Sequence, residues 1–583
     1  MVKSGRVKEK VAMYTFYVAI FFLSFILFNL LISTIFFIFN VRIQSWYVPC
    51  SFVLSTVLTV LLMKRRGIVK KSSILICIVL PILITCGLIP LNSKIYDYTY
   101  DGNSYHKLTI GMMMDGWNPL METEEEFNEK KGEGKMDISG LEFKWGDYYA
   151  KASHIFAANI GKMTGSVESG KILNDLSLAI LFLLVLALCL YIKKSWTFSV
   201  LFAFVMVTPT TVVSQLLTNY VDGLVYLYMF LLATLFFWFE YAKEYKEEVL
   251  GIFFATLVIL INIKFSSFAY AGILCAVYYG WYIYRYKKEK KFDKKFFKRF
   301  SWTAFAAVVV GVFVVGLSVY PKNLVTHGHP FYPLMGEGKV DIMTENSPDY
   351  FKSKSNIEKF FIATFSKMDN FSEIDNKEAE LKIPFAVYES EIERTKECDS
   401  RISGNGVFFG GILIVSISVI LICARRVFIR NRKLFIMLTL PILMTIVMII
   451  TMSDVWWARY FPQVHFIVFA ALIILDMYKN EFARAILYTL FSLIIVNNMI
   501  FVGGAIAKSY DYTKDANKMI LAYHTIYGPD DCKVIFSTKK FPGGFYSVRN
   551  KFDKYEIGYE SFDESAEYMR IMGVEVMARC EKK

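Results

Sequence analysis

Residues 72–91 read SSILICIVLPILITCGLIPL, a stretch of the chain without a single charged side chain. A helix of this length rises about 30 Å, which is the thickness of the hydrocarbon core of a bilayer. Similar apolar runs recur along the chain, where 55% of the 583 residues are hydrophobic and only 20% are charged. The sequence therefore predicts an all-α polytopic membrane protein.

Thirteen such runs are long enough to be predicted as membrane spans. They cover residues 12–38, 47–63, 73–91, 172–192, 196–215, 218–240, 248–263, 266–285, 300–320, 407–424, 433–452, 459–477 and 481–503. We expect them to form a transmembrane domain, residues 1–506. The remaining residues, 507–583, are predicted to form a small α/β tail, with strands at 532–537 and 573–578 and a helix at 563–572.

The net charge of +13 is concentrated in short connectors between the apolar runs. Lys and Arg gather at residues 64–71, 193–194, 284–299 and 424–433, and this pattern places those connectors in the cytoplasm. It does not indicate a nucleic-acid-binding face. We expect a multi-pass plasma membrane protein whose first span is not cleaved off as a signal peptide. Its two long loops, 92–171 and 321–406, and its tail are expected to lie outside the cytoplasm.

The nine cysteines lie mostly inside the predicted spans and do not form a disulfide framework, although the sequence allows a Cys532–Cys580 bridge in the tail. The sequence has no phosphate-binding glycine loop, no dinucleotide fingerprint and no His–Glu zinc motif. No internal repeat of the kind found in many transporters is visible.

The polar residues best suited to catalysis directly follow the quoted span, in YDYTYDGNSYHK at residues 96–107. A carboxylate among aromatic side chains is partly desolvated, so Asp97 or Asp101 could act as a general base. The alternative is a plain juxtamembrane turn with interfacial tyrosines. The next residues predict a short helix lying on the membrane surface, with Trp117 at the level of the lipid headgroups.

Other polar residues lie at the outer ends of predicted spans. Asp222 in NYVDG is either a helix N-cap or a partner of the first carboxylate. Arg459 in WWARYFPQ suits bidentate phosphate binding, although it could instead pair with Asp454 or with lipid; Lys264 has the same ambiguity. His327 and His329, in THGHPFYP, are a weak metal signal, and we favour a structural or substrate-lining role.

Taken together, these motifs resemble the GT-C superfamily of polytopic glycosyltransferases, which includes protein mannosyltransferases and lipid A aminoarabinose transferases. The matching stretches are YDGNSYH (residues 100–106), GWNP (116–119), NYVDG (219–223) and WWARY (456–460). In many members the first span leads directly into the catalytic loop, whereas here the third predicted span does. The tail is not covered by the resemblance.

The resemblance implies transfer of a sugar, with inversion, from a polyprenyl-phosphate donor to an extracytoplasmic glycan, lipid or protein acceptor. Asp101 is the expected base, with Asp97 as its rival, and Asp222 orients the site or holds a divalent cation; no other cofactor is expected. The donor phosphate is expected to meet Arg459, Lys264, Lys107 and His106. The sugar and acceptor are expected to be lined by Tyr105, Trp117, Asn118, Tyr220, Trp457 and His329. The alternative function is a flippase or transporter of a lipid-linked saccharide or polysaccharide.

Overall fold

The computed structural model describes most of the chain. The described residues are 2–131, 140–288, 293–342, 346–369, 378–478, 480–531, 533–537, 542–555, 558–561, 569–571 and 574–579. Within them, nine helices are long and apolar enough to cross a membrane. The protein is therefore a helical multi-pass membrane protein. Cys532 and Cys580 lie outside the described residues, and the other cysteines are free thiols.

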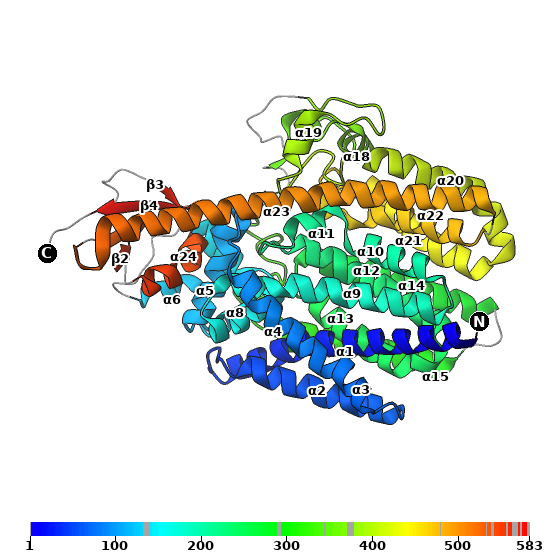
Figure 1. Ribbon diagram of the computed structural model, residues 1–583, viewed down its shortest axis with the longest axis horizontal. Helices are drawn as coiled ribbons and strands as arrows, with labels where there is room; N and C mark the ends of the chain where they lie inside the picture. The colour runs from blue at the N-terminus through cyan, green and yellow to red at the C-terminus, as the bar shows by residue number, and fades with distance from the viewer. Residues whose placement is uncertain are drawn as a thin grey trace.

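The nine spans form an elongated bundle, in which α1, α9 and α23 follow the long axis and α4 crosses them obliquely (Figure 1). They are α1 (Val2–Ile38), α2 (Tyr47–Arg65), α3 to α4 (Lys71–Ser93, with η1 Leu75–Val79 between Lys71–Ile74 and Leu80–Ser93), η4 and α9 (Val167–Lys171, Ile172–Tyr191), α12 (Asp222–Tyr241), α15 and η6 (Lys294–Val310, Gly311–Val315), α20 (Phe409–Arg430), α21 (Arg432–Thr451) and α23 (Glu481–Asp531). Each coincides with a predicted span.

The other four predicted spans coincide with helices that are shorter or less apolar. They are α10 and α11 (Trp196–Val207, Thr210–Gln215), α13 (Lys246–Leu260, after η5 Lys243–Tyr245), α14 (Phe265–Lys288) and α22 (His465–Asp476, after η9 Pro462–Val464). The count of thirteen crossings therefore stays a prediction. An odd number of crossings agrees with the positions of the two termini, which lie at opposite ends of the long axis (Figure 1).

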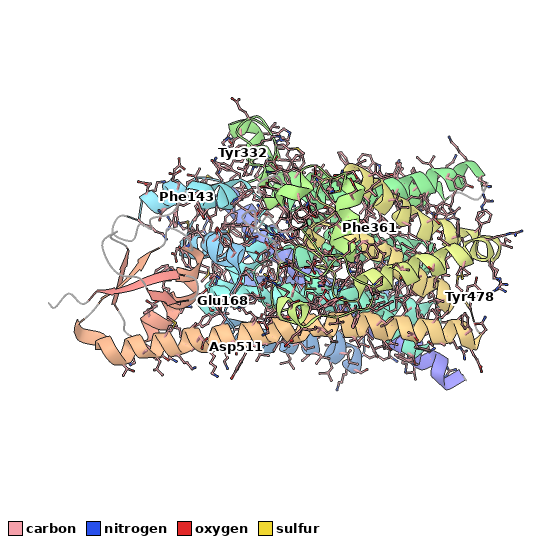
Figure 2. All side chains as sticks on the ribbon, turned by 90° about the horizontal axis from the view of Figure 1, so that it is seen from above. Phe143, Glu168, Tyr332, Phe361, Tyr478 and Asp511 are labelled. Atoms are coloured by element: carbon pink, nitrogen blue, oxygen red, sulfur yellow. The ribbon has the colours of Figure 1, made fainter. Side chains whose placement is uncertain are left out.

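The basic connectors meet at one end of the bundle, where ion pairs join them. Lys194 pairs with Asp476, and Lys433 and Arg285 both pair with Glu240 at 2.6 and 2.7 Å. The positive-inside pattern therefore describes one physical face of the molecule. Tyr478 marks this end in Figure 2, far from the strands.

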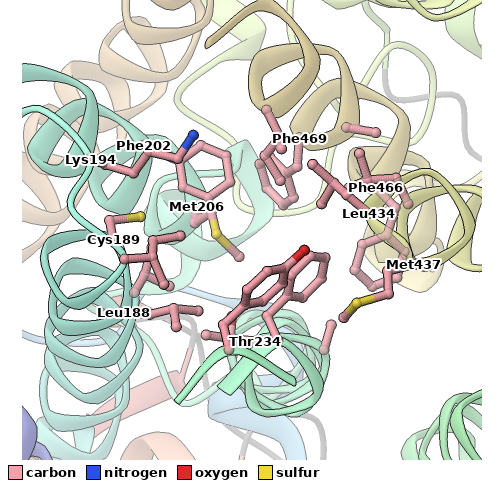
Figure 3. A pocket seen from close by; sticks show the side chains of 18 of the residues that line it. Leu188, Cys189, Lys194, Phe202, Met206, Thr234, Leu434, Met437, Phe466 and Phe469 are labelled. Carbon is pink, nitrogen blue, oxygen red and sulfur yellow. The ribbon is translucent and has the colours of Figure 1, made fainter. Parts of the chain in front are cut away.

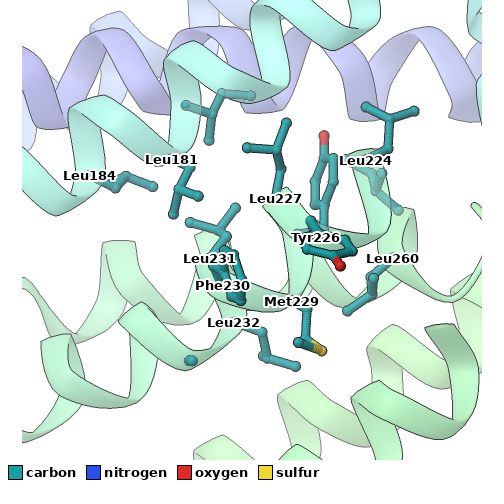
Figure 4. Close-up of a cluster of buried hydrophobic side chains, with 14 of the residues drawn as sticks. Leu181, Leu184, Leu224, Tyr226, Leu227, Met229, Phe230, Leu231, Leu232 and Leu260 are labelled. Atoms are coloured by element: carbon teal, nitrogen blue, oxygen red, sulfur yellow. The ribbon is translucent and has the colours of Figure 1, made fainter. Parts of the chain in front are cut away.

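The centre of the bundle is α12, which is buried on every side. Its neighbours are α9, α13 and α14, and side chains such as Leu227, Phe230 and Leu231 interdigitate with Leu181 and Leu260 (Figure 4). A helix that is apolar all round is expected at such a position. Because α12 is held so tightly, its first residue, Asp222, has a fixed place at the end of the bundle opposite the basic connectors.

Short helices cover the end of the bundle opposite the basic connectors (Figure 1). The first long loop forms η2 (Gly102–His106), α5 (Lys107–Asp115), α6 (Glu124–Glu129), α7 (Gly140–Tyr148) and α8 (Ala152–Thr164). The second long loop forms α16 (Tyr320–His327), η7 (Asp349–Phe351), α18 (Asn356–Phe365) and α19 (Glu389–Arg394), followed after α21 by η8 (Ala458–Tyr460).

The prediction that residues 107–117 lie on the membrane surface is wrong. Helix α5 packs against α8 and α24, and its residues from Lys107 to Met114 are buried. Trp117 is also fully buried, and its indole nitrogen donates to the carbonyl oxygen of Glu122 at 3.2 Å. The apolar residues that suggested an interfacial helix are instead covered by other parts of the protein.

Helix α23 continues well past the predicted domain boundary at residue 506, as the longest helix of Figure 1. Beyond it lie β1 (Lys533–Ser537), α24 (Pro542–Lys554), β2 (Gly558–Ser561), β3 (Met569–Ile571) and β4 (Val574–Arg579). The strand order is β2-β1-β4-β3, with β1 parallel to β2 and the other pairs antiparallel. Residues 569–571, predicted to be helical, are therefore a strand.

Helix α24 docks directly behind the loop that carries Asp101. Two glycines permit this contact: a Cβ on Gly543 would lie 2.7 Å from the carbonyl oxygen of Asn103, and one on Gly111 would lie 2.2 Å from the ring of Tyr546. A buried network seals the interface, because Glu168 accepts from Lys107 at 3.1 Å and from Ser547 at 2.6 Å.

Candidate functional site

A cavity of about 640 Å³, called the outer cavity below, opens at the end of the bundle opposite the basic connectors. Nine charged residues of the described chain line it, and five of them, from separate parts of the chain, form a cluster of ion pairs. These five are Asp101 before η2, Asp222 at the start of α12, Lys264 between α13 and α14, Asp399 after α19 and Arg459 in η8. The site is assembled from the ends of helices that the bundle holds rigidly.

Arg459 is the hub of this cluster. Its Nη1 lies 3.3 Å from Oδ2 of Asp101 and 3.9 Å from Oδ2 of Asp222, and its Nε lies 3.3 Å from Oδ1 of Asp399. Nη2 donates to the hydroxyl of Tyr460 at 2.7 Å. The alternative pairing with Asp454 is not made, and the guanidinium instead faces three carboxylates.

Lys264 is the second cation of the cavity. Its Nζ donates to Asp222 and lies 4.1 Å from the centre of the Tyr460 ring. Burial lowers the pKa of Lys264, while the neighbouring carboxylate of Asp222 opposes that shift. Asp222 is almost fully buried and lies between Lys264 and Arg459. Its negative charge is therefore balanced by two cations.

Asp101 is far more open to the cavity than Asp222. Its side chain is 23% exposed, against 3% for Asp222. Burial raises the pKa of Asp101, the carboxylates of Asp399 and Asp222 raise it further, and Arg459 and Lys264 lower it. An accessible carboxylate with a raised pKa has the properties of a general base.

Asp97 differs from Asp101 in both burial and partners. Its carboxylate is fully buried and accepts four hydrogen bonds. The backbone and side-chain nitrogens of Asn219 donate to Oδ2 at 2.7 and 2.9 Å, and the backbone nitrogen and hydroxyl of Thr99 donate to Oδ1 at 2.9 and 2.6 Å. This carboxylate ties the first outer loop to the segment before α12.

His106 lines the cavity beside the charged cluster. Its Nδ1 lies 2.7 Å from Nε2 of His154, which comes from α8. Burial lowers the pKa of His106 to about 3, so the ring is neutral at ordinary pH. The His154 contact fixes one ring nitrogen of His106 and leaves the other to the cavity side.

Aromatic rings surround the charged groups. The guanidinium of Arg459 lies 4.3 Å from the ring centre of Trp457 and 5.5 Å from that of Tyr220. The Trp457 indole nitrogen donates to Oδ1 of Asp399 at 2.7 Å, which fixes both side chains. Tyr105 completes this wall, and its ring centre lies 6.2 Å from that of Trp145.

The structure thus brings eight of the predicted site residues to one cavity. Those lining it are Asp101, Asp222, Lys264, Arg459, His106, Tyr105, Tyr220 and Trp457. The others lie elsewhere: Asp97 and Lys107 are buried in the loop interfaces, Trp117 and Asn118 pack near α1, and Nδ1 of His329 accepts from the backbone of Phe331.

Sequence reasoning missed several residues of the cavity. Asp399 pairs with Arg459, and Tyr460 contacts both cations. Tyr460 is the last residue of the WWARY motif, so the sequence already indicated that it lies near Arg459. Asp399 lies in a polar loop, in ECDSR, where no pattern separates it from its neighbours. Lys508 of α23 also reaches the cavity.

The predicted divalent cation has no matching set of ligands within the described residues, where no group of three or more His, Cys, Asp or Glu side chains could hold a metal ion. Arg459 and Lys264 take the places between the carboxylates. Comparison of the sequence with protein-family models and with curated proteins finds no match.

Proposed function

We propose that this protein is a membrane glycosyltransferase that moves a sugar from a polyprenyl-phosphate donor to an extracytoplasmic acceptor, with inversion. The observation that carries the proposal is the contact between Asp101 and Arg459 in an aromatic-lined cavity. One side chain suits removal of a proton, and the other suits binding of a phosphate.

In this reaction the acceptor hydroxyl gives its proton to Asp101 as its oxygen attacks the anomeric carbon of the donor sugar. The bond from that carbon to the phosphate oxygen breaks on the opposite face, and polyprenyl phosphate leaves with the electron pair. Arg459 and Lys264 stabilise the negative charge of the leaving phosphate, which is the kind of interaction that contributes most to such catalysis.

The remaining cavity residues have supporting roles in the proposal. Asp222 holds Lys264 and approaches Arg459, so it orients both cations. Tyr105, Tyr220 and Trp457 offer flat faces on which the apolar face of a sugar ring packs. A donor anchored in the bilayer needs no nucleotide-binding motif, which agrees with the absence of one in the sequence.

A flippase would need a polar route across the bundle from this cavity. Inward of the cavity, the interface of α12 with the segment before α22 is instead filled by large side chains. Tyr226 donates to the carbonyl oxygen of Ala458, and the ring of Phe230 lies 5.6 Å from that of Phe466. This packing favours the transferase.

The test is release of polyprenyl phosphate by the purified full chain, given a panel of polyprenyl-phosphate sugars and extracted envelope acceptors. Asp101→Asn should abolish turnover, whereas Asp349→Asn, the same change at an exposed outer-loop position, should not. The proposal fails if no donor is consumed while the protein moves lipid-linked sugars across proteoliposome membranes.

A further inference from the structure

A second cavity, of about 360 Å³, lies inside the bundle in the half that carries the basic connectors. One wall is formed by the later turns of α9, by α10 and by the later turns of α12, and the opposite wall by α21 and α22. Figure 3 shows Leu188 and Cys189 facing Phe466 and Met437 across this space. It is separated from the outer cavity by the packed side chains of Tyr226 and Phe230.

The chemistry of the lining is almost entirely that of hydrocarbon. Phe198, Phe202, Phe469 and Ile473 are typical of it, and the hydroxyl of Thr234 is already used, since it donates to the carbonyl oxygen of Phe230 at 2.8 Å. A polar ligand would therefore find no free partner in the inner part. Apolar cavities of this kind do not hold ordered water, and an unfilled space deprives the lining atoms of contacts.

The other polar lining residues lie at one end. Lys194 and Asn431 belong to the connectors and Tyr241 ends α12, and the ion pairs Lys194–Asp476 and Lys433–Glu240 link the two walls there. The cavity is therefore amphiphilic along its length, with an apolar interior and a polar mouth at the cytoplasmic face. This is the polarity of a lipid whose headgroup stays at the interface.

The mouth also carries excess positive charge. Lys193 and Arg430 are the chain neighbours of the lining residues Lys194 and Asn431, and both are exposed. Among the described residues, Lys193 has no acidic partner, and Arg430 contacts only the ring of Tyr478, at 5.9 Å. Cations placed at this depth attract anionic lipid headgroups.

We infer that this inner cavity is a binding site for one acyl chain of an anionic phospholipid from the cytoplasmic leaflet. The chain lies between the α9–α10–α12 wall and the α21–α22 wall, and the phosphate lies beside Lys193 and Arg430. The two walls also meet through aromatic contacts, such as that of Phe230 with Phe469 at 5.1 Å, and the lipid fills the space that these contacts leave. The inference does not depend on the proposed function.

The test uses the purified full chain in detergent, titrated with phosphatidylglycerol or phosphatidylcholine and observed by native mass spectrometry. We expect one phosphatidylglycerol to be retained in preference to phosphatidylcholine. Ala470→Phe places a ring in the cavity and should weaken retention about tenfold or more. Ile446→Phe, on the outward face of α21, is the matched control and should retain the lipid.

A second variant keeps the test valid if Ala470→Phe does not fold. The double change Lys193→Gln and Arg430→Gln leaves the cavity walls intact and should remove the preference for phosphatidylglycerol. Equal retention of both lipids by the wild type, or unchanged retention by folded Ala470→Phe, would overturn the inference. Retention of a polyprenyl phosphate in place of phosphatidylglycerol would overturn it too, and would assign the cavity to the donor's tail.

Discussion

Replacing Asp97 and Asp101 separately by Asn should damage two different properties of the protein. The Asp97 carboxylate is fully buried and accepts four hydrogen bonds from Asn219 and Thr99. An Asn amide keeps one oxygen and turns the other into a donor, so two of those bonds are lost and two donors face an NH₂ group. With about 1.5–3 kcal/mol for each bond to a charged group, Asp97→Asn should cost roughly 3–6 kcal/mol of stability.

Asp101→Asn should have the opposite profile. The Asp101 side chain is partly exposed, and its contact with Arg459 is 3.3 Å long, so the loss of stability should be below about 1 kcal/mol. Loss of a general base lowers the rate by about 10²–10⁴-fold. The folded protein should therefore bind donor and turn it over at a small fraction of the normal rate.

Two assays on each purified variant separate these outcomes. Thermal unfolding followed by tryptophan fluorescence should show a fall of several degrees for Asp97→Asn and little change for Asp101→Asn. Release of polyprenyl phosphate should show the large loss for Asp101→Asn, while folded Asp97→Asn retains turnover. If Asp97→Asn is stable and inactive while Asp101→Asn is active, the assignment of the base to Asp101 is refuted.

Three further predictions follow from the same contacts. First, kcat/KM should fall as the pH is lowered through the pKa of Asp101, because a protonated carboxyl cannot accept a proton. Since burial raises this pKa, the acid limb of the pH profile lies above pH 3.8. Arg459→Gln should move this limb to still higher pH, because it removes a positive charge that lowers the pKa of Asp101. A limb that stays in place in Arg459→Gln would contradict this. Second, Glu168→Gln leaves the buried Lys107 and Lys171 uncompensated and should destabilise the protein by about 3–5 kcal/mol in thermal unfolding, whereas the exposed Glu389→Gln should not. Third, Gly543→Ala should displace α24 from the loop and speed proteolytic cleavage after α23, while Gly251→Ala, where a Cβ meets nothing within 4 Å, should leave the cleavage rate unchanged.

The membrane-spanning part of the fold could be predicted because its signal is local. A run such as residues 72–91 must be a helix in a bilayer, whatever its neighbours are. The limits of this reasoning appear at α5 and α23. The apolar residues 108–114 suggested contact with lipid but face α8 and α24, and nothing between residues 506 and 531 signals that α23 passes through the predicted boundary.

The candidate site was predictable only where a polar residue stood out against an apolar span. Asp222, Lys264 and Arg459 did so, and all three reach the outer cavity. Lys107 and Asp97 stood out equally but are engaged in holding α24 and the segment before α12. Sequence position does not distinguish a buried structural charge from a catalytic one, because the difference lies in which distant segments pack against it.

The charges of the outer cavity suggest how base and leaving-group assistance are coupled in the proposed reaction. Three carboxylates face two cations, so the cluster carries one excess negative charge before any donor binds. A phosphate approaching Arg459 adds more negative charge and weakens the hold of the guanidinium on Asp101, and both changes make that carboxylate a stronger base. When Asp101 then takes the acceptor's proton, its own charge disappears and Arg459 is released from it. The guanidinium becomes free for the leaving phosphate at the step in which negative charge develops there.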